Sequence, residues 1–113
     1  MRYLLLICVD ETLQLSPGEG AAMQSATESW VAEMDGRGVR LQGEALRPVS
    51  EATTVRVRDG EMLVSDGPFA ETKEQVAGFN VLECADLDEA IKVASRHPTA
   101  KIGTFELRPL QQP

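Results

Sequence analysis

Aromatic residues, cysteines and metal-ligand motifs are all scarce in this sequence. Aromatic side chains make up 4% of the 113 residues, so a hydrophobic core has to be aliphatic. The 42% share of hydrophobic residues is sufficient for such a core at this length. The two cysteines, Cys8 and Cys84, lie far apart inside apolar segments, and no CxxC or Cys/His spacing is present. We therefore expect two free thiols and no bound metal.

Basic charge is also scarce. The chain has 11 Lys and Arg against 18 Asp and Glu, a net charge of −7, which disfavours binding to nucleic acid. The longest apolar run, residues 3–9, is too short to span a membrane, and no signal-peptide pattern is present. No nucleotide-binding motif occurs, so we expect no cofactor. These features predict one domain over residues 1–113, located in the cytoplasm, without a nucleic-acid or membrane partner.

The first third of the chain predicts a strand followed by a helix. The continuous apolar run over residues 3–9 is typical of a buried strand. Ser16 and Glu19 form a capping-box pattern around Pro17, and this pattern predicts the start of a helix. The apolar face of that helix is predicted at Met23, Ala26, Trp30 and Met34.

Residues 54–65 predict a β-hairpin. Asp59-Gly60 is a strong signal for a two-residue type I′ turn, which pairs Arg58 with Glu61. The alternation of side chains then gives the hairpin two unlike faces. One face carries Val55, Val57, Met62 and Val64, and the other carries Arg56, Arg58 and Glu61.

A second helix begins at Asp86 and ends before Pro98, with a predicted core face at Leu87, Ala90, Ile91 and Ala94. Strands over residues 39–49, 78–84 and 104–110 complete the order β-α-β-(β-hairpin)-β-α-β. This order predicts an α+β, ferredoxin-like fold, with an antiparallel sheet, two helices on one face and an extra β-hairpin. The opposite face of the sheet has no cover, so we expect a homodimer.

The loop Asp66-Gly67-Pro68-Phe69 is predicted to be rigid. Gly67 permits a positive φ, Pro68 fixes the φ angle that comes next in the chain, and Asp66 can cap the turn. Phe69 then has a defined direction, as a core plug or as a cleft wall. Glu71 and Lys73 follow; in a closed cleft such a pair can transfer protons, whereas in solvent it is a charged loop.

His97 is the only histidine of the chain. Its near-neutral pKa suits a general base, and the alternative is a structural role at the end of the second helix. The candidate catalytic residues are Asp66, Glu71 and Lys73. The candidate ligand-binding residues are Arg56, Gly67, Pro68, Phe69 and His97.

Residues 66–74, DGPFAETKE, resemble the signature of the DGPF proteins in the YciI-related group. The resemblance continues at residues 53–56, 78–79, 86–90 and 106–109. It implies a ferredoxin-like fold that pairs as a dimeric α+β barrel, with a cleft between sheet and partner. Other YciI-like proteins have a proposed His/Asp acid–base pair. Here the first helix has no histidine, and His97 is the candidate substitute.

Two hypotheses of function follow. In the first, the protein is a cofactor-free enzyme: Asp66 or Glu71 moves a proton on a small organic substrate, Lys73 or Arg56 holds an anionic group, and Phe69 closes the pocket. In the second, the protein is a non-catalytic module that binds a small molecule or has a regulatory role, and the loop is structural.

Overall fold

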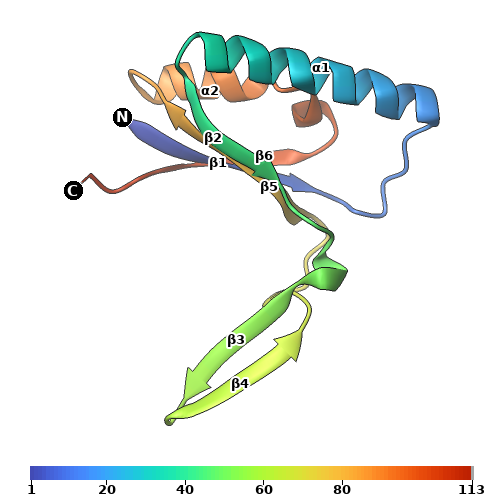
Figure 1. Ribbon diagram of the computed structural model, residues 1–113, viewed down its shortest axis with the longest axis vertical. Helices are drawn as coiled ribbons and strands as arrows, with labels where there is room; N and C mark the ends of the chain where they lie inside the picture. Colours follow the sequence, from blue (N-terminus) through green and yellow to red (C-terminus); the bar gives the residue numbers. More distant parts are fainter. Residues whose placement is uncertain (113) are drawn as a thin grey trace.

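The computed structural model describes residues 1–112. Its main sheet has the strand order β2-β5-β1-β6 and is antiparallel throughout. These strands are β1 (Arg2–Val9), β2 (Arg40–Ala45), β5 (Gln75–Glu83) and β6 (Thr104–Pro109). Helices α1 (Pro17–Gly36) and α2 (Leu87–Ser95) both cover one face of the sheet (Figure 1). The predicted ferredoxin-like α+β fold is thereby confirmed.

Strand β1 lies at the centre of the sheet because both of its faces are apolar. It pairs with β5 on one side and with β6 on the other. Leu5 is fully buried toward the helices, where it joins Leu82 of β5 and Met34 of α1 in the core. Leu4 and Leu6 point to the opposite face and are only half-buried, so that face stays open among the described residues.

Both predicted helix starts are confirmed. The Ser16 hydroxyl accepts from the backbone N–H of Glu19 at 3.2 Å, and the Glu19 carboxylate accepts from the N–H of Ser16 at 3.1 Å. The carboxylate of Asp86 accepts from the N–H of Glu89 at 2.9 Å. These contacts satisfy N–H groups that have no partner within the helix.

The predicted apolar faces of the two helices need correction. Trp30 is buried as expected, but Ala26 is exposed. Thr27, which follows Ala26 in α1, lines a cavity, so this part of the helix does not pack against the core. In α2, Leu87 and Ile91 are each 49% exposed. A nine-residue helix at the margin of the sheet buries a narrower stripe than its apolar pattern suggests.

The hairpin consists of β3 (Thr53–Arg58) and β4 (Glu61–Asp66), and its predicted register is confirmed, with Arg58 opposite Glu61. Asp59 and Gly60 have φ angles of 51° and 77°, as a type I′ turn requires. The hairpin forms a separate two-stranded sheet. It projects from the main sheet on the side opposite to the helices (Figure 1).

Short connections complete the chain. They include two 3-10 helices, η1 (Val49–Glu51) between β2 and β3 and η2 (Pro98–Lys101) between α2 and β6. Cys8 and Cys84 are free thiols. They lie at opposite ends of the sheet, since Cys8 pairs with Val76 at the start of β5 and Cys84 follows its last residue.

Candidate functional site

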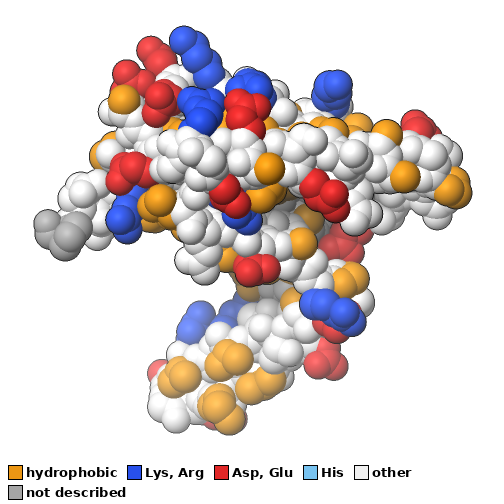
Figure 2. All heavy atoms as spheres, turned by 45° about the horizontal axis from the view of Figure 1, so that its top comes forward, with side chains coloured by type: hydrophobic (Ala, Val, Ile, Leu, Met, Phe, Trp, Pro, Cys, Tyr) orange, Lys and Arg blue, Asp and Glu red, His pale blue; other side chains and the backbone are white. Residues whose placement is uncertain are grey.

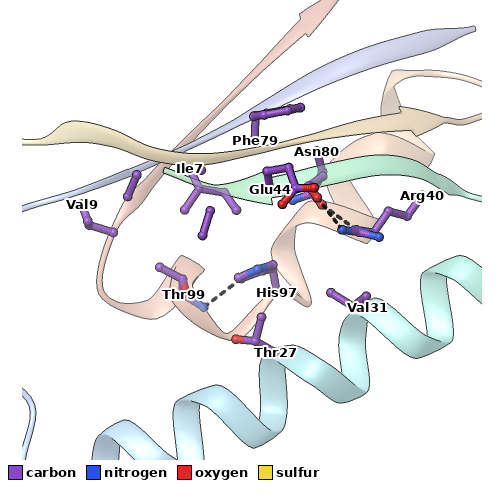
Figure 3. Close-up of a pocket in the computed structure, with 14 residues that line it drawn as sticks. Ile7, Val9, Thr27, Val31, Arg40, Glu44, Phe79, Asn80, His97 and Thr99 are labelled. Atoms are coloured by element: carbon purple, nitrogen blue, oxygen red, sulfur yellow. Dashed lines mark hydrogen bonds between the residues drawn. The ribbon is translucent and has the colours of Figure 1, made fainter. Parts of the chain in front are cut away.

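A cavity of ≈ 390 Å³ lies between α1 and the sheet, and we call it the helix-side cavity. Its size falls within the range of small-molecule sites, about 300–1,000 Å³. Its walls come from β1, α1, β2, β5 and η2 (Figure 3). Its apolar wall includes Ile7, Val9 and Val31, and its polar side chains include Thr27, Arg40, Asn80, His97 and Thr99.

Arg40 is held in this cavity by a network of hydrogen bonds. Its Nε donates to Oδ1 of Asn80 at 2.8 Å, and its Nη2 donates to the carbonyl of Gly43 at 3.0 Å. Its Nη1 forms an ion pair with Asp35 at 3.0 Å. Because the Arg40 side chain is only 18% exposed, this network orients a largely desolvated guanidinium group.

Gly43 is required by the same network. A Cβ atom at this position would overlap Oδ1 of Asn80 and lie 2.8 Å from Nη2 of Arg40. Asn80 is 6% exposed and stands on a central strand, so it has little room to move. The glycine that interrupts β2 therefore lets two polar side chains approach the backbone beneath the cavity.

His97 is buried at the inner end of the cavity. Only 5% of it is exposed, and its ring makes edge contacts with Trp30 and Phe105, at centroid distances of 4.8 and 5.3 Å. Its Nδ1 accepts a hydrogen bond from the backbone N–H of Thr99 at 3.1 Å, and this bond caps η2. Burial lowers the pKa of His97 below its ordinary value, so the ring is neutral near pH 7.

The hydrogen bond at Nδ1 decides which nitrogen carries the proton. A neutral imidazole has one donor and one acceptor nitrogen, and Nδ1 is the acceptor here. The proton is therefore on Nε2, for which no residue between 1 and 112 provides a hydrogen-bond partner. Because the ring lines the cavity, His97 presents a hydrogen-bond donor to it. In this state His97 is not a general base.

Stability should depend on pH through His97. The folded state keeps this ring neutral by desolvation, whereas the unfolded chain protonates near pH 6.5. The unfolded chain thus binds more protons below that pH, so the free energy of unfolding should fall as the pH drops from 7 to 5. Urea unfolding at several pH values measures this slope, and the variant His97→Gln should reduce it. Equal slopes in both proteins would contradict the assignment.

The loop of residues 66–74 lies elsewhere. Among the described residues, none of this loop lines the helix-side cavity. Pro68 and Phe69 instead border a shallow hollow beside residues 46–54, and Phe69 is 82% exposed. Phe69 is thus a wall of that hollow and not a core plug. His97 and the loop do not share a site.

The charged residues among the predicted site residues are also exposed. Asp66 is the last residue of β4, and Glu71 and Lys73 lie in the following loop. Arg56 is on the exposed hairpin. Gly67 has a φ of 93°, as expected, but the side-chain hydrogen bond to this turn comes from Thr54 and not from Asp66. The Thr54 hydroxyl donates to the carbonyl of Gly67 at 2.8 Å.

Sequence reasoning missed Arg40, Asn80 and Thr99. An Arg near a Gly on a weakly patterned strand carries no local signal of a site. Asn80 was one detectable exception, because it is a polar residue that alternates with Gly78 and Leu82 on the buried face of β5. A buried Asn needs a hydrogen-bond partner, and here the partner is Arg40.

Two further properties of the chain concern residues 1–112. Within this range no group of three or more His, Cys, Asp or Glu side chains is placed to hold a metal ion. Within the same range, no helix combines the length and the hydrophobicity needed to cross a bilayer.

The fold and the cavity define a ferredoxin-like α+β domain with a polar pocket beneath its first helix. The model of the YCII-related domain matches residues 1–112, and this chain belongs to that family. An uncharacterised protein of Rhizobium meliloti (strain 1021) is 39% identical over 104 residues. That match covers 77% of this chain and 84% of the relative.

A solved structure has a similar fold. It is a 5-chloro-2-hydroxyhydroquinone dehydrochlorinase from Burkholderia phenoliruptrix, in complex with 2,5-dihydroxybenzoquinone. The TM-score is 0.51 and the sequence identity is 14%, with 100% of this chain and 96% of that chain covered. At this identity the likeness establishes the fold and not the activity.

Proposed function

We propose that this protein is a cofactor-free enzyme that acts on a small organic substrate in the helix-side cavity. The observation that carries the proposal is the buried ring of His97, which presents Nε2–H to the same cavity as the oriented guanidinium of Arg40. Both groups are hydrogen-bond donors, and both are held in position by other residues. Preorganised donors in a partly dry site stabilise negative charge on oxygen.

The reaction class that suits these donors is one that develops an enolate or a phenolate. Arg40 and His97 would stabilise the oxyanion while the substrate proton passes to a water molecule of the solvent. Among the residues that line the cavity, Glu44 is the one carboxylate, and its side chain is exposed. The dehydrochlorinase with the similar fold is bound to a small hydroxylated quinone, a ligand with several oxygens of this kind.

A second candidate is a non-catalytic small-molecule-binding module. The proton on Nε2 of His97 favours it, because a donor at this position can bind an oxygen but cannot abstract a proton. The two candidates share the ligand site and differ only in turnover. We also propose that the domain acts as a homodimer, on the basis of the half-buried residues Leu4 and Leu6 on the open sheet face.

Ligand binding should depend on Arg40. A thermal-shift screen of small carboxylates, phenols and hydroxyquinones, including 2,5-dihydroxybenzoquinone, should find compounds that raise the melting temperature. A ligand at a hundred times its Kd adds about 2.7 kcal/mol to the stability. Arg40→Met should weaken the binding of a hit roughly 10- to 100-fold, because it removes a charged donor. Arg47→Met, at an arginine that is 82% exposed, is the matched control and should bind normally.

The same hits should then be assayed for chemical turnover. Conversion that is lost in Arg40→Met and retained in Arg47→Met supports the enzyme, whereas binding without conversion supports the module. Asp66→Asn tests the loop in the same assay, and full activity in that variant removes Asp66 from the mechanism. Hits that bind Arg40→Met as tightly as the wild type would place the ligand outside the helix-side cavity.

A further inference from the structure

The side chain of Asn80 is oriented by its hydrogen bond to Arg40. Asn80 stands on β5 opposite Leu5 of the central strand, and only 6% of it is exposed. Its Oδ1 accepts from Nε of Arg40 at 2.8 Å. Because an arginine N–H can only donate, the amide oxygen has to face it, and the amide nitrogen Nδ2 points away. This buried amide therefore has its acceptor end fixed and two N–H donors left.

The free donors of Asn80 open into the helix-side cavity. Among residues 1–112, Nδ2 of Asn80 has no hydrogen-bond partner. Within the same range, the one enclosed side-chain atom that lacks a partner belongs to Glu74, so Nδ2 is not sealed inside the protein. Asn80 lines the cavity, and Nδ2 faces that space. Since buried polar groups in folded proteins are nearly always paired, this donor favours a ligand with an acceptor atom.

A second donor lies beside it. Arginine has five N–H groups. For Arg40, Nε donates to Asn80, and Nη1 donates to both carboxylate oxygens of Asp35, at 3.0 and 3.3 Å. Nη2 donates one N–H to the carbonyl of Gly43, so its other N–H remains. A Cβ atom at Gly43 would lie 2.8 Å from this Nη2 and 2.9 Å from Cγ of Asn80, so the two side chains are adjacent. In Figure 3 the ring of His97 lies between these strands and α1.

The charged groups around the cavity carry no net positive charge. The guanidinium of Arg40 is balanced by Asp35, Glu44 is a further carboxylate in the wall, and His97 is neutral. Figure 2 shows acidic side chains standing among the basic ones, so the face in view does not gather positive charge that would attract an anion. A carboxylate ligand would lose its hydration here without gaining a free counter-ion. An uncharged carbonyl group costs far less to desolvate.

We propose that Asn80 is a ligand-binding residue, and that its amide selects an uncharged ligand with a carbonyl oxygen over a carboxylate of the same shape. The carbonyl oxygen accepts from Nδ2, next to the remaining N–H of Arg40. This inference rests on the proposed function and names the class of substrate for the same cavity. An uncharged carbonyl compound gains negative charge only as it reacts, so these donors bind the transition state more strongly than the ground state.

Two probes of nearly equal size separate charge from shape. The compounds 4-hydroxyacetophenone and 4-hydroxybenzoate share the ring and the hydroxyl group, and they differ in an acetyl group against a carboxylate. Ligand-observed NMR titration at pH 7 measures both dissociation constants. The wild type should bind the ketone at least about tenfold more tightly, because the carboxylate has to be desolvated beside an arginine that is already paired.

Three variants locate the selectivity. Asn80→Asp replaces the amide nitrogen by oxygen, while the other oxygen can still accept from Arg40, and it should weaken the ketone on the order of 10-fold. Gln42→Glu makes the same amide-to-carboxylate change at an exposed position of β2 outside the cavity wall, and it should bind the ketone as the wild type does. Asp35→Asn removes the carboxylate paired with Arg40, so it should bind the carboxylate probe more tightly and narrow the preference.

Urea unfolding shows whether each variant is folded. Equal affinity for the two probes in the wild type, or an unchanged preference in Asp35→Asn, would overturn the selection of an uncharged ligand. Ketone affinity that Asn80→Asp leaves unchanged would overturn the role of Asn80. In each of these cases, ketone binding that is weakened in Arg40→Met still supports the helix-side cavity as the ligand site. If neither probe binds the wild type, or if Arg40→Met binds the ketone normally, the ligand site of the proposed function fails together with this inference.

Discussion

Replacing His97 by Asn is expected to remove most of the ligand affinity of the helix-side cavity while the fold is retained. The Asn Oδ1 lies where Nδ1 of the imidazole is, so it can accept the hydrogen bond from the N–H of Thr99 and cap η2. No Asn atom reaches the position of Nε2, so the donor into the cavity is lost. Losing one such donor costs roughly 10²–10³-fold in kcat where it stabilises a developing oxyanion.

His97→Gln is the complementary variant. The Gln amide reaches approximately as far as Nε2 and can still donate into the cavity, whereas the contact at the Nδ1 position is lost. It should bind better than His97→Asn and unfold more easily. Isothermal titration with a hit from the thermal-shift screen, together with urea unfolding of both variants, measures the two effects separately.

Two results would contradict this account of His97. If Asn binds and turns over as well as His, the Nε2 proton has no role in the site. If both variants lose binding and stability in parallel, His97 acts only by filling the space between Trp30 and Phe105.

Trp30→Ala is expected to cost about 3–5 kcal/mol of the free energy of unfolding. Trp30 is 4% exposed, and its Nε1 donates to the carbonyl of Val93 at 3.0 Å. It therefore ties α1 to α2 over the sheet and also supports the ring of His97 from one side. The Ala variant loses buried apolar surface, leaves a cavity and removes one buried hydrogen bond.

Trp30→Phe separates packing from hydrogen bonding. It retains an aromatic ring but cannot donate to Val93, so the free energy of unfolding should fall by roughly 1–3 kcal/mol because of the unmade bond and the altered packing. This loss is smaller than the loss expected for the Ala variant. Chemical denaturation followed by circular dichroism gives both values. A loss below about 1.5 kcal/mol in Trp30→Ala would show that this residue is not a core anchor, since core Trp→Ala changes cost more.

The elements that were predicted well depend on short stretches of sequence. The capping contacts of Ser16 and Asp86 join residues three positions apart, and each is decided by local backbone geometry. The hairpin register follows from the two-residue turn at Asp59-Gly60, since such a turn leaves one pairing of the flanking strands. The order of these elements was sufficient to predict the ferredoxin-like sheet.

The helix faces were predicted less well, because periodicity shows which residues can be buried and not what lies opposite. Ala26 is exposed, whereas its neighbour Thr27 lines the cavity, and Leu87 and Ile91 are exposed because α2 lies over the margin of the sheet near β6. Such differences depend on the position of a helix over the sheet, which local pattern does not contain.

The sequence by itself determined the two helix starts, the ferredoxin-like order and the two unlike faces of the hairpin, because each depends on neighbours in the chain. Only the tertiary structure decided the candidate site. It brought His97 of the α2–η2 junction together with Arg40 of β2 and Asn80 of β5, and it left the loop of residues 66–74 exposed elsewhere. The physical reason is that the cavity lies in a gap between α1 and the sheet. The local sequence does not show where such a gap between packed elements will form. The same holds for the proton on Nε2 of His97, which depends on one backbone N–H from Thr99.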